Sequence, residues 1–205
     1  MPHSGQHSGN VTLAAIHFAR GVDVDALLLE ACDALRARGL RLGGVIQRAS
    51  GALGECSASV RVVDLRSGKA YDIWEERGAC ASGCRLDERG LIDAEATIKA
   101  TITEGVDLVV LNRFGRAESL GRGLTACFAA AIEAGVPVLT AVRAPYDEAW
   151  HAFHGGLGQD LPADREQVTG WALRATERRL ASPAGPLGVA TPPMRPEAET
   201  GTPRA

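Results

Sequence analysis

The run Asp-Leu-Val-Val-Leu-Asn-Arg-Phe-Gly-Arg-Ala-Glu, residues 107–118, decides how this 205-residue chain folds. Residues 108–111 are apolar at consecutive positions, as in a strand of a parallel sheet that helices cover on both faces. The strand then stops at a polar loop that contains glycine. Open α/β sheets hold their ligands outside the carboxyl ends of their strands, so this loop is the predicted site.

The segments around this strand alternate between short apolar runs and stretches with helical spacing of apolar residues. Strands are predicted at 11–18, 42–47, 106–111 and 136–142, and as a hairpin at 60–65 and 70–74. Helices are predicted at 23–38, 91–104, 120–134, 146–154 and 164–180. Strands that alternate with helices require crossover connections. The sequence therefore predicts an α/β fold of three layers, with a mostly parallel sheet and an antiparallel hairpin at its edge.

Composition indicates a single domain. The chain is 45% hydrophobic but only 4% aromatic, so aliphatic side chains and alanine must fill the core. We expect one α/β domain over residues 11–180, after a disordered lead-in at 1–10. Six of the ten prolines lie in residues 181–205, which lack hydrophobic periodicity and are predicted to be a disordered tail.

Charge and hydropathy exclude several function classes. The net charge of -3 and the pI of about 6.0 argue against nucleic-acid binding, which draws on a basic surplus. No apolar run approaches the ~20 residues that span a bilayer. The first ten residues lack the pattern of a signal peptide. We therefore expect a cytoplasmic protein whose five cysteines are mostly reduced.

The loop at 112–123 has the composition of an anion site. It carries Arg113, Arg116 and Arg122, whose guanidinium groups are suited to oxyanions. It also leads into a helix, and a helix amino end has free N–H groups and partial positive charge. The alternative is that these arginines are solvated and that Glu118 pairs locally with one of them.

The turn after the first strand, residues 17–23, stands where nucleotide-binding α/β proteins carry their phosphate loop. It contains one glycine and no Lys-Ser/Thr pair. Asp23 is best interpreted as a helix N-cap, and an ordinary capped turn explains the segment. Arg20 remains a candidate contact for an anion.

The cysteines do not form a recognisable metal signature. Cys80 and Cys84 are spaced C-x3-C, whereas zinc and iron–sulfur sites need about four ligands. Cys32 and Cys127 fall within predicted helices and are expected in the core. Arg85 follows Cys84 and would lower the pKa of its thiol, so Cys84 is a candidate reactive thiol.

Asp147, His151 and His154 have a spacing that places them on one face of a helix, where they would be able to hold a metal. Trp150 and Phe153 indicate, however, that the opposite face is buried. A solvated polar face explains this pattern, and no metal site is predicted. The sequence also shows no convincing nucleophile–base pair for catalysis.

Several short motifs resemble those of a bacterial domain family of uncharacterised function, over about Val11 to Arg174. They are the segments at 44–47, 84–87, 112–118, 121–124 and 137–142, and Asn-Arg-Phe-Gly at 112–115 is the most specific. That family is similar to small P-loop nucleoside-triphosphatases and is often encoded near molybdenum-transport or molybdenum-nitrogenase genes. The resemblance implies a P-loop NTPase-like fold.

The resemblance also shows where the chain departs from those enzymes. Their corresponding strand ends in the Walker B element Asp-Glu-x-Gly-(Lys/Arg)-x-Glu. Here Asn112 replaces the magnesium-linked Asp and Arg113 the catalytic Glu, while Gly115, Arg116 and Glu118 match. Phosphoryl transfer depends on a phosphate cradle, a lysine and magnesium, so most of that machinery is missing.

We therefore expect a noncatalytic accessory protein that binds an anion, such as molybdate, or a nucleotide without magnesium. The candidate ligand-binding residues are Asn112, Arg113, Gly115, Arg116, Glu118 and Arg122, with Arg20 and Arg85 second. Neither a cofactor nor a protein partner is identified. Two alternatives stay open: a nucleoside triphosphatase with a degenerate phosphate loop, and a protein-interaction module that uses the proline-rich tail or the cysteine loop.

Overall fold

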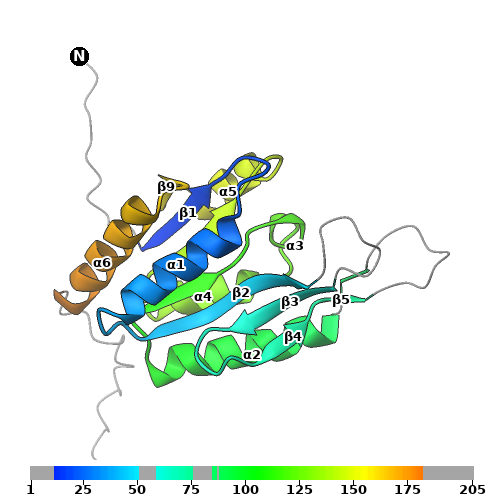
Figure 1. Cartoon of the computed structure of the whole chain (residues 1–205), viewed down its shortest axis with the longest axis horizontal. Coiled ribbons are helices and arrows are strands. Elements are labelled where there is room, and N and C mark those ends of the chain that lie inside the picture. Colours follow the sequence, from blue (N-terminus) through cyan, green and yellow to red (C-terminus); the bar gives the residue numbers. More distant parts are fainter. Residues whose placement is uncertain (1–11, 51–58, 76–84, 87, 182–205) are drawn as a thin grey trace, which may run out of the picture.

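The computed structural model describes residues 12–50, 59–75, 85–86 and 88–181. Seven strands form one sheet (Figure 1). They are β1 (Leu13–His17), β2 (Leu42–Ser50), β3 (Ser59–Asp64), β4 (Ala70–Asp72), β7 (Leu108–Leu111), β8 (Val138–Val142) and β9 (Gly158–Pro162). A second sheet pairs β5 (Trp74–Glu75) with β6 (Arg85–Leu86).

The large sheet has the strand order β4-β3-β2-β7-β8-β1-β9. The five strands from β2 to β9 in this order run parallel, while β3 is antiparallel to β2 and β4 is antiparallel to β3. The predicted α/β class, the mostly parallel sheet and the antiparallel hairpin at its edge are confirmed.

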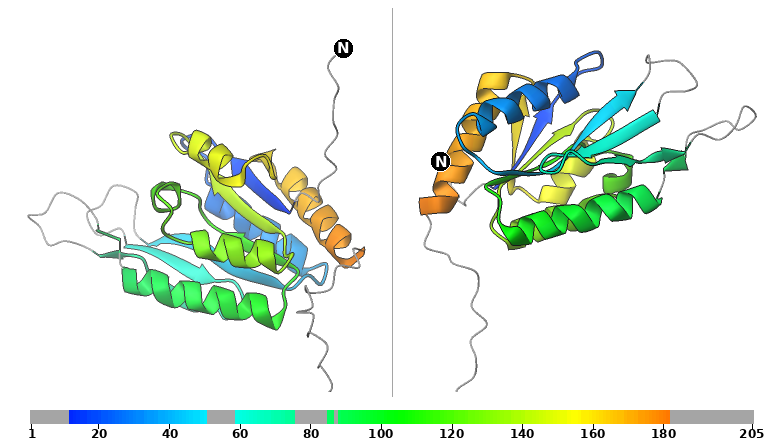
Figure 2. Two further views of the ribbon diagram at one scale, coloured as in Figure 1. Left: turned by 180° about the vertical axis from the view of Figure 1, so that it is seen from behind. Right: turned by 60° about the horizontal axis from the view of Figure 1, so that its bottom comes forward.

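Helices cover both faces of this sheet, which gives the predicted three layers. They are α1 (Val24–Arg36), α2 (Glu88–Glu104), α3 (Arg116–Ser119), α4 (Thr125–Glu133), α5 (Asp147–His154) and α6 (Arg165–Ala181). The right view of Figure 2 shows α1 and α6 on one side of the sheet and α2 and α4 on the other. Among the described residues, no helix combines the length and the apolar character that crossing a membrane requires.

Strand β7 contributes to the two hydrophobic cores, one on each face of the sheet. Leu108 and Val110 pack with α1 and α6, whereas Val109 and Leu111 pack with α2, α4 and α5. All four side chains are buried. Successive side chains of a strand point to opposite faces, so a strand between two helical layers must be apolar at every position.

The structure corrects the prediction after β7. The predicted helix at 120–134 is shorter, α4 at 125–133, and a short helix that was not predicted, α3 at 116–119, precedes it across a turn. Gly121 and Gly123 in that turn have φ of +70° and +65°, which other residues rarely adopt.

Several further elements differ from the prediction: β2 continues to Ser50, beyond its predicted end at residue 47, and β6 was not predicted. Strand β9 was not predicted, because Gly158–Pro162 is an edge strand with one buried side chain, Leu161. Helix α2 begins at Glu88 rather than at residue 91. The predicted lead-in at 1–10, almost all of the predicted tail at 181–205, and both Cys80 and Cys84 lie outside the described residues.

Candidate functional site

The candidate site lies where the loops after β1, β7 and β8 begin. These three strands are neighbours in the order β7-β8-β1, and all run in the same direction. From β1 the chain continues to α1 on one face of the sheet, and from β8 to α5, which packs in the core of the other face. The site is therefore at a topological switch point, where open α/β sheets bind ligands.

Asn112 and Arg113 converge on Asp25 in the first turn of α1. Arg113 Nη2 lies 2.9 Å from each oxygen of Asp25, and Asn112 Nδ2 donates to Asp25 Oδ1 at 2.6 Å. The ion pair is shielded, with 25% of the Arg113 side chain and 22% of the Asp25 side chain exposed. Sequence reasoning missed Asp25, since the contact joins residues 88 positions apart.

Two arginines, Arg113 and Arg143, lie close to the ring of Phe18. The Arg113 guanidinium carbon lies 5.4 Å from the centroid of the Phe18 ring, and that of Arg143 lies 6.0 Å from it. Phe18 follows β1 and Arg143 follows β8, so each adjacent strand contributes one residue. Arg143 is exposed, while Arg113 Nε and Asn112 Oδ1 are buried without a hydrogen-bond partner among the described residues.

Glu118 shapes the loop after β7 from inside. It is 8% exposed, and its two oxygens accept hydrogen bonds from the backbone N–H groups of Gly115 and Leu124, both at 3.0 Å. Burial raises the pKa of Glu118, and these backbone hydrogen bonds partly oppose that effect. A Cβ atom on Gly123 would collide with Glu118 Oε1. Glu118 is thus bonded to the backbone rather than to a neighbouring arginine.

None of the other predicted anion contacts is hydrogen-bonded to Asn112, Arg113 or Asp25 in the part of the chain that the structure describes. Arg20 follows β1, Arg116 is the first residue of α3, and Arg122 lies in the turn between α3 and α4; all three are exposed. Arg85 is in β6, far along the chain from β7, and its side chain lies outside the described part of the structure. Gly115 precedes α3 and donates its N–H to Glu118.

Replacing Glu118 by glutamine is expected to destabilise the protein by about 1–3 kcal/mol, because the amide nitrogen would face a buried backbone N–H group that then loses its acceptor. The free energy of unfolding from urea titration measures this effect. Glu133→Gln, at an exposed position of α4, is the matched control and should change stability by less than about 0.5 kcal/mol. Equal stability of the two variants would contradict the role of Glu118 in the loop.

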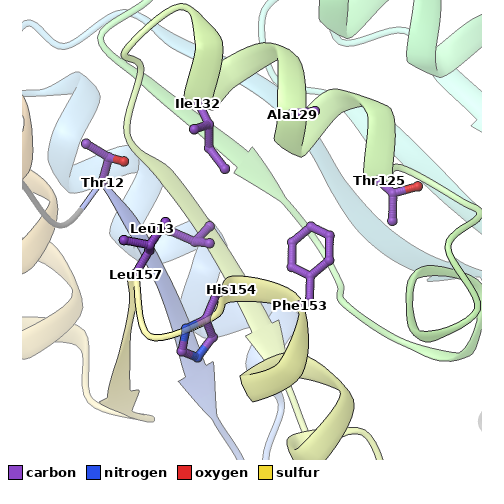
Figure 3. A pocket seen from close by; sticks show the side chains of 8 residues that line it. All are labelled: Thr12, Leu13, Thr125, Ala129, Ile132, Phe153, His154 and Leu157. Carbon is purple, nitrogen blue, oxygen red and sulfur yellow. The ribbon is translucent and has the colours of Figure 1, made fainter.

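An apolar pocket of about 190 Å³ opens elsewhere, between α4 and α5 (Figure 3). Its lining residues are Thr12, Leu13, Thr125, Ala129, Ile132, Phe153, His154 and Leu157. Leu13 begins β1, whereas Phe18 follows its carboxyl end, so the pocket is separate from the candidate site. Burial lowers the pKa of His154, whose Nδ1 accepts from the N–H groups of Gly156 and Gly158.

A polar cluster lies beside the candidate site, at the end of β1. His17 Nδ1 is 3.1 Å from Asp147 Oδ1, and His17 Nε2 is 2.8 Å from Asp160 Oδ1. His151 Nε2 is 2.9 Å from the other oxygen of Asp160. Burial opposes ionisation of Asp160, but hydrogen bonds from His151 and His17 outweigh it and lower the pKa of this carboxyl. Sequence reasoning considered Asp147 and His151 but missed His17 and Asp160.

Comparison with known proteins supports the resemblance seen in the sequence. The chain is 38% identical over 168 residues to "Molybdenum import ATP-binding protein ModC 2" of Bradyrhizobium diazoefficiens. That alignment covers 82% of this chain but 19% of the relative, so the chain spans about a fifth of that protein.

A solved structure, the "Solution Structure of a Human Cancer-Related Nucleoside Triphosphatase", has the same fold. It aligns with a TM-score of 0.56 and 14% identity, over 84% of this chain and 99% of that one. The predicted likeness of the fold to nucleoside-triphosphatases is confirmed. A family described as "Protein of unknown function (DUF2478)" matches residues 13–171. The chain therefore belongs to this DUF2478 family.

Proposed function

We propose that this chain is a noncatalytic binding domain for a small anion, either an oxyanion such as molybdate or a nucleotide held without magnesium. One observation carries the proposal: the guanidinium groups of Arg113 and Arg143 both lie against the Phe18 ring at the switch point of the sheet. Two guanidinium groups offer forked donors for an oxyanion, and the aromatic ring offers a surface on which a planar base can stack.

The Asp25 ion pair leaves donors of Arg113 available. Arg113 contacts Asp25 only through Nη2, and its Nε is buried, so Nη1 is the nitrogen that remains to donate to a ligand; it makes no hydrogen bond within the described part of the chain. The pair orients the guanidinium group while it neutralises one charge. The exposed residues Arg20, Arg116 and Arg122 add positive charge on the surrounding loops. This arrangement favours an anion as the ligand.

The local chemistry supports binding without phosphoryl transfer. Asn112 and Arg113 stand where the similar nucleoside-triphosphatases carry two acids. The carboxylate of Asp25 is already bonded to both of them, so it is not free to hold magnesium. Since phosphoryl transfer requires a metal ion and a positioned nucleophile, the site is better suited to holding an anion than to transferring phosphate.

The name of this relative supports a place in molybdenum metabolism. The matched region of that molybdenum import ATP-binding protein is similar to most of this chain. We propose that the chain works as an accessory to molybdenum uptake, with molybdate as the first anion to test. Molybdate carries tetrahedrally arranged oxygens, which two guanidinium groups can contact from different directions.

Calorimetric titration of the purified chain with molybdate, sulfate, and ATP with and without magnesium tests the proposal. We expect saturable binding of molybdate or of metal-free ATP, weakened about tenfold or more in Arg113→Ala, because a hydrogen bond to a charged group contributes about 1.5–3 kcal/mol. Arg61→Ala is the matched control: Arg61 also pairs with an aspartate, Asp72, but on the antiparallel strands β3 and β4. The Arg61→Ala variant should bind these anions with the affinity of the wild type.

Three results would overturn the proposal. If the wild type binds none of these anions, or if Arg113→Ala and Arg61→Ala bind them equally well, the switch point is not the binding site. Magnesium-dependent release of phosphate from ATP, abolished by Arg113→Ala, would show instead that the chain is an active nucleoside triphosphatase.

A further inference from the structure

We propose that His17, His151 and Asp160 bind a divalent transition-metal ion, for which zinc is the probe. The three residues come from the end of β1, from α5 and from β9, and they lie on the flank of the sheet where β9 is the edge strand. Figure 1 shows α5 beside the end of β1. This site is separate from the Arg113 site and does not depend on the function proposed above.

The ligand atoms are already close enough to share one ion. One atom from each of the three residues lies within 4.8 Å of the other two. Zinc binds nitrogen and oxygen at about 2.0–2.1 Å, which places neighbouring ligands of a tetrahedral site about 3.3 Å apart. Asp160 already lies 2.8 Å from His17 Nε2 and 2.9 Å from His151 Nε2. These contacts involve different oxygens of Asp160, so small rotations of the three side chains would be needed to bring one atom of each to the spacing of a tetrahedral site.

The contacts of His17 favour a cation at this position. Its Nδ1 faces a carboxylate oxygen of Asp147 and its Nε2 faces one of Asp160. A neutral imidazole has one N–H, so it can donate to one of these acceptors and not to both. With Nδ1 donating to Asp147, Nε2 meets the negative oxygen of Asp160 through a cation, which is either a second proton on the ring or a metal ion. A metal ion bonds to both of these atoms and accepts His151 Nε2 as a third ligand, which a proton on His17 cannot do.

Residues around the three ligands are arranged as supports. Asp147 bonded to Nδ1 of His17 gives the carboxylate–histidine–metal arrangement, which selects the tautomer that coordinates through Nε2. Trp150, which is fully buried, donates its Nε1–H to Asp160 Oδ1 at 3.3 Å and so restrains the carboxylate. A carboxylate that is a metal ligand is commonly held by such a hydrogen bond.

The donor set indicates the class of metal. Two imidazoles and one carboxylate suit zinc and other first-row transition metals better than calcium or magnesium, which prefer oxygen ligands. Three protein ligands leave a coordination position for water or an anion. His154 does not belong to the set, since its Nδ1 accepts backbone hydrogen bonds and its Nε2 is buried. About half of the His151 and Asp160 side chains is exposed, so an ion can enter from solvent.

The test is zinc affinity of the full chain after removal of bound metal with a chelator, measured by competition with a chromogenic indicator. We expect one zinc ion per chain at this site. His151→Ala and Asp160→Asn should weaken it at least about 100-fold, and Asp147→Asn about 10–100-fold, as for loss of a supporting residue. Gln159→Ala, the exposed neighbour of Asp160 in β9, is the matched control and should bind like the wild type.

The comparison among variants also identifies competing sites. All variants keep the five cysteines and the histidines His3 and His7, so zinc held by those residues would persist unchanged in His151→Ala and Asp160→Asn. That result, or the absence of zinc binding by the wild type, would overturn the proposal. His17, His151 and Asp160 would then be joined by hydrogen bonds alone. Circular dichroism checks that each variant is folded. His151→Gln replaces His151→Ala if the alanine variant does not fold.

Discussion

Replacing Gly44 by alanine is expected to cost more than about 4 kcal/mol of folding free energy and to leave little folded protein. Gly44 lies in β2 and pairs with Val110 of β7, near the centre of the seven-stranded sheet. Its φ is +95°, and a Cβ atom there would collide with the carbonyl oxygen of Val110. The two strands would have to separate, which breaks hydrogen bonds in the middle of the sheet.

Gly39→Ala is the control that separates backbone strain from this collision. Gly39 has a similar φ of +84°, but a Cβ atom there would meet no atom within 4 Å. Its substitution should therefore cost only the strain of the left-handed conformation, about 1–2 kcal/mol. Urea unfolding followed by circular dichroism measures both variants. Similar stabilities for the two would show that the sheet tolerates a side chain at position 44.

Truncating Trp150 to alanine is expected to destabilise the protein by about 3–5 kcal/mol, as for other large aromatic residues in a core. Trp150 is fully buried, and its ring centroid lies 5.3 Å from that of Phe114 and 6.4 Å from that of Phe128. Phe114 follows β7 and Phe128 belongs to α4, so Trp150 joins α5 to the loop that carries Arg113. The midpoint of thermal or urea unfolding should fall accordingly.

Trp150→Phe separates packing from the hydrogen bond to Asp160. Phenylalanine retains most of the aromatic packing but cannot donate to the Asp160 carboxylate. We expect a loss of stability of about 1–2 kcal/mol, smaller than for alanine, together with a roughly tenfold loss of zinc affinity. Unchanged zinc affinity in Trp150→Phe would show that the indole N–H does not support the metal site.

Much of the fold could be predicted because the signals are local. The consecutive apolar residues at 108–111 identify a strand buried on both faces, and the hairpin is marked by its turn. Strand β9 escaped prediction because its exposed, polar residues resemble a loop until a neighbouring strand pairs with them. The break between α3 and α4 escaped as well, since it depends on the buried Glu118 and the positive φ of two glycines.

The sequence identified only some of the residues of the candidate site. Arg113 and Asn112 were singled out from the motif after β7, and in the structure they directly follow that strand. Their partner Asp25 lies in the first turn of a different helix, where an acidic residue is explained equally well by the helix dipole. No local pattern distinguishes an aspartate that stabilises a helix from one that holds an arginine.

The sequence by itself determined the α/β class with its mostly parallel sheet, and it predicted a ligand loop after β7 and the residues that separate this chain from similar nucleoside-triphosphatases. Only the tertiary structure decided that His17 meets Asp160, which is 143 positions away, and that His151 joins them. The physical reason is that periodicity and turn chemistry act between neighbours in the chain. Contacts across strands follow from the strand order, which places β9 beside β1 and brings the end of each to the same edge.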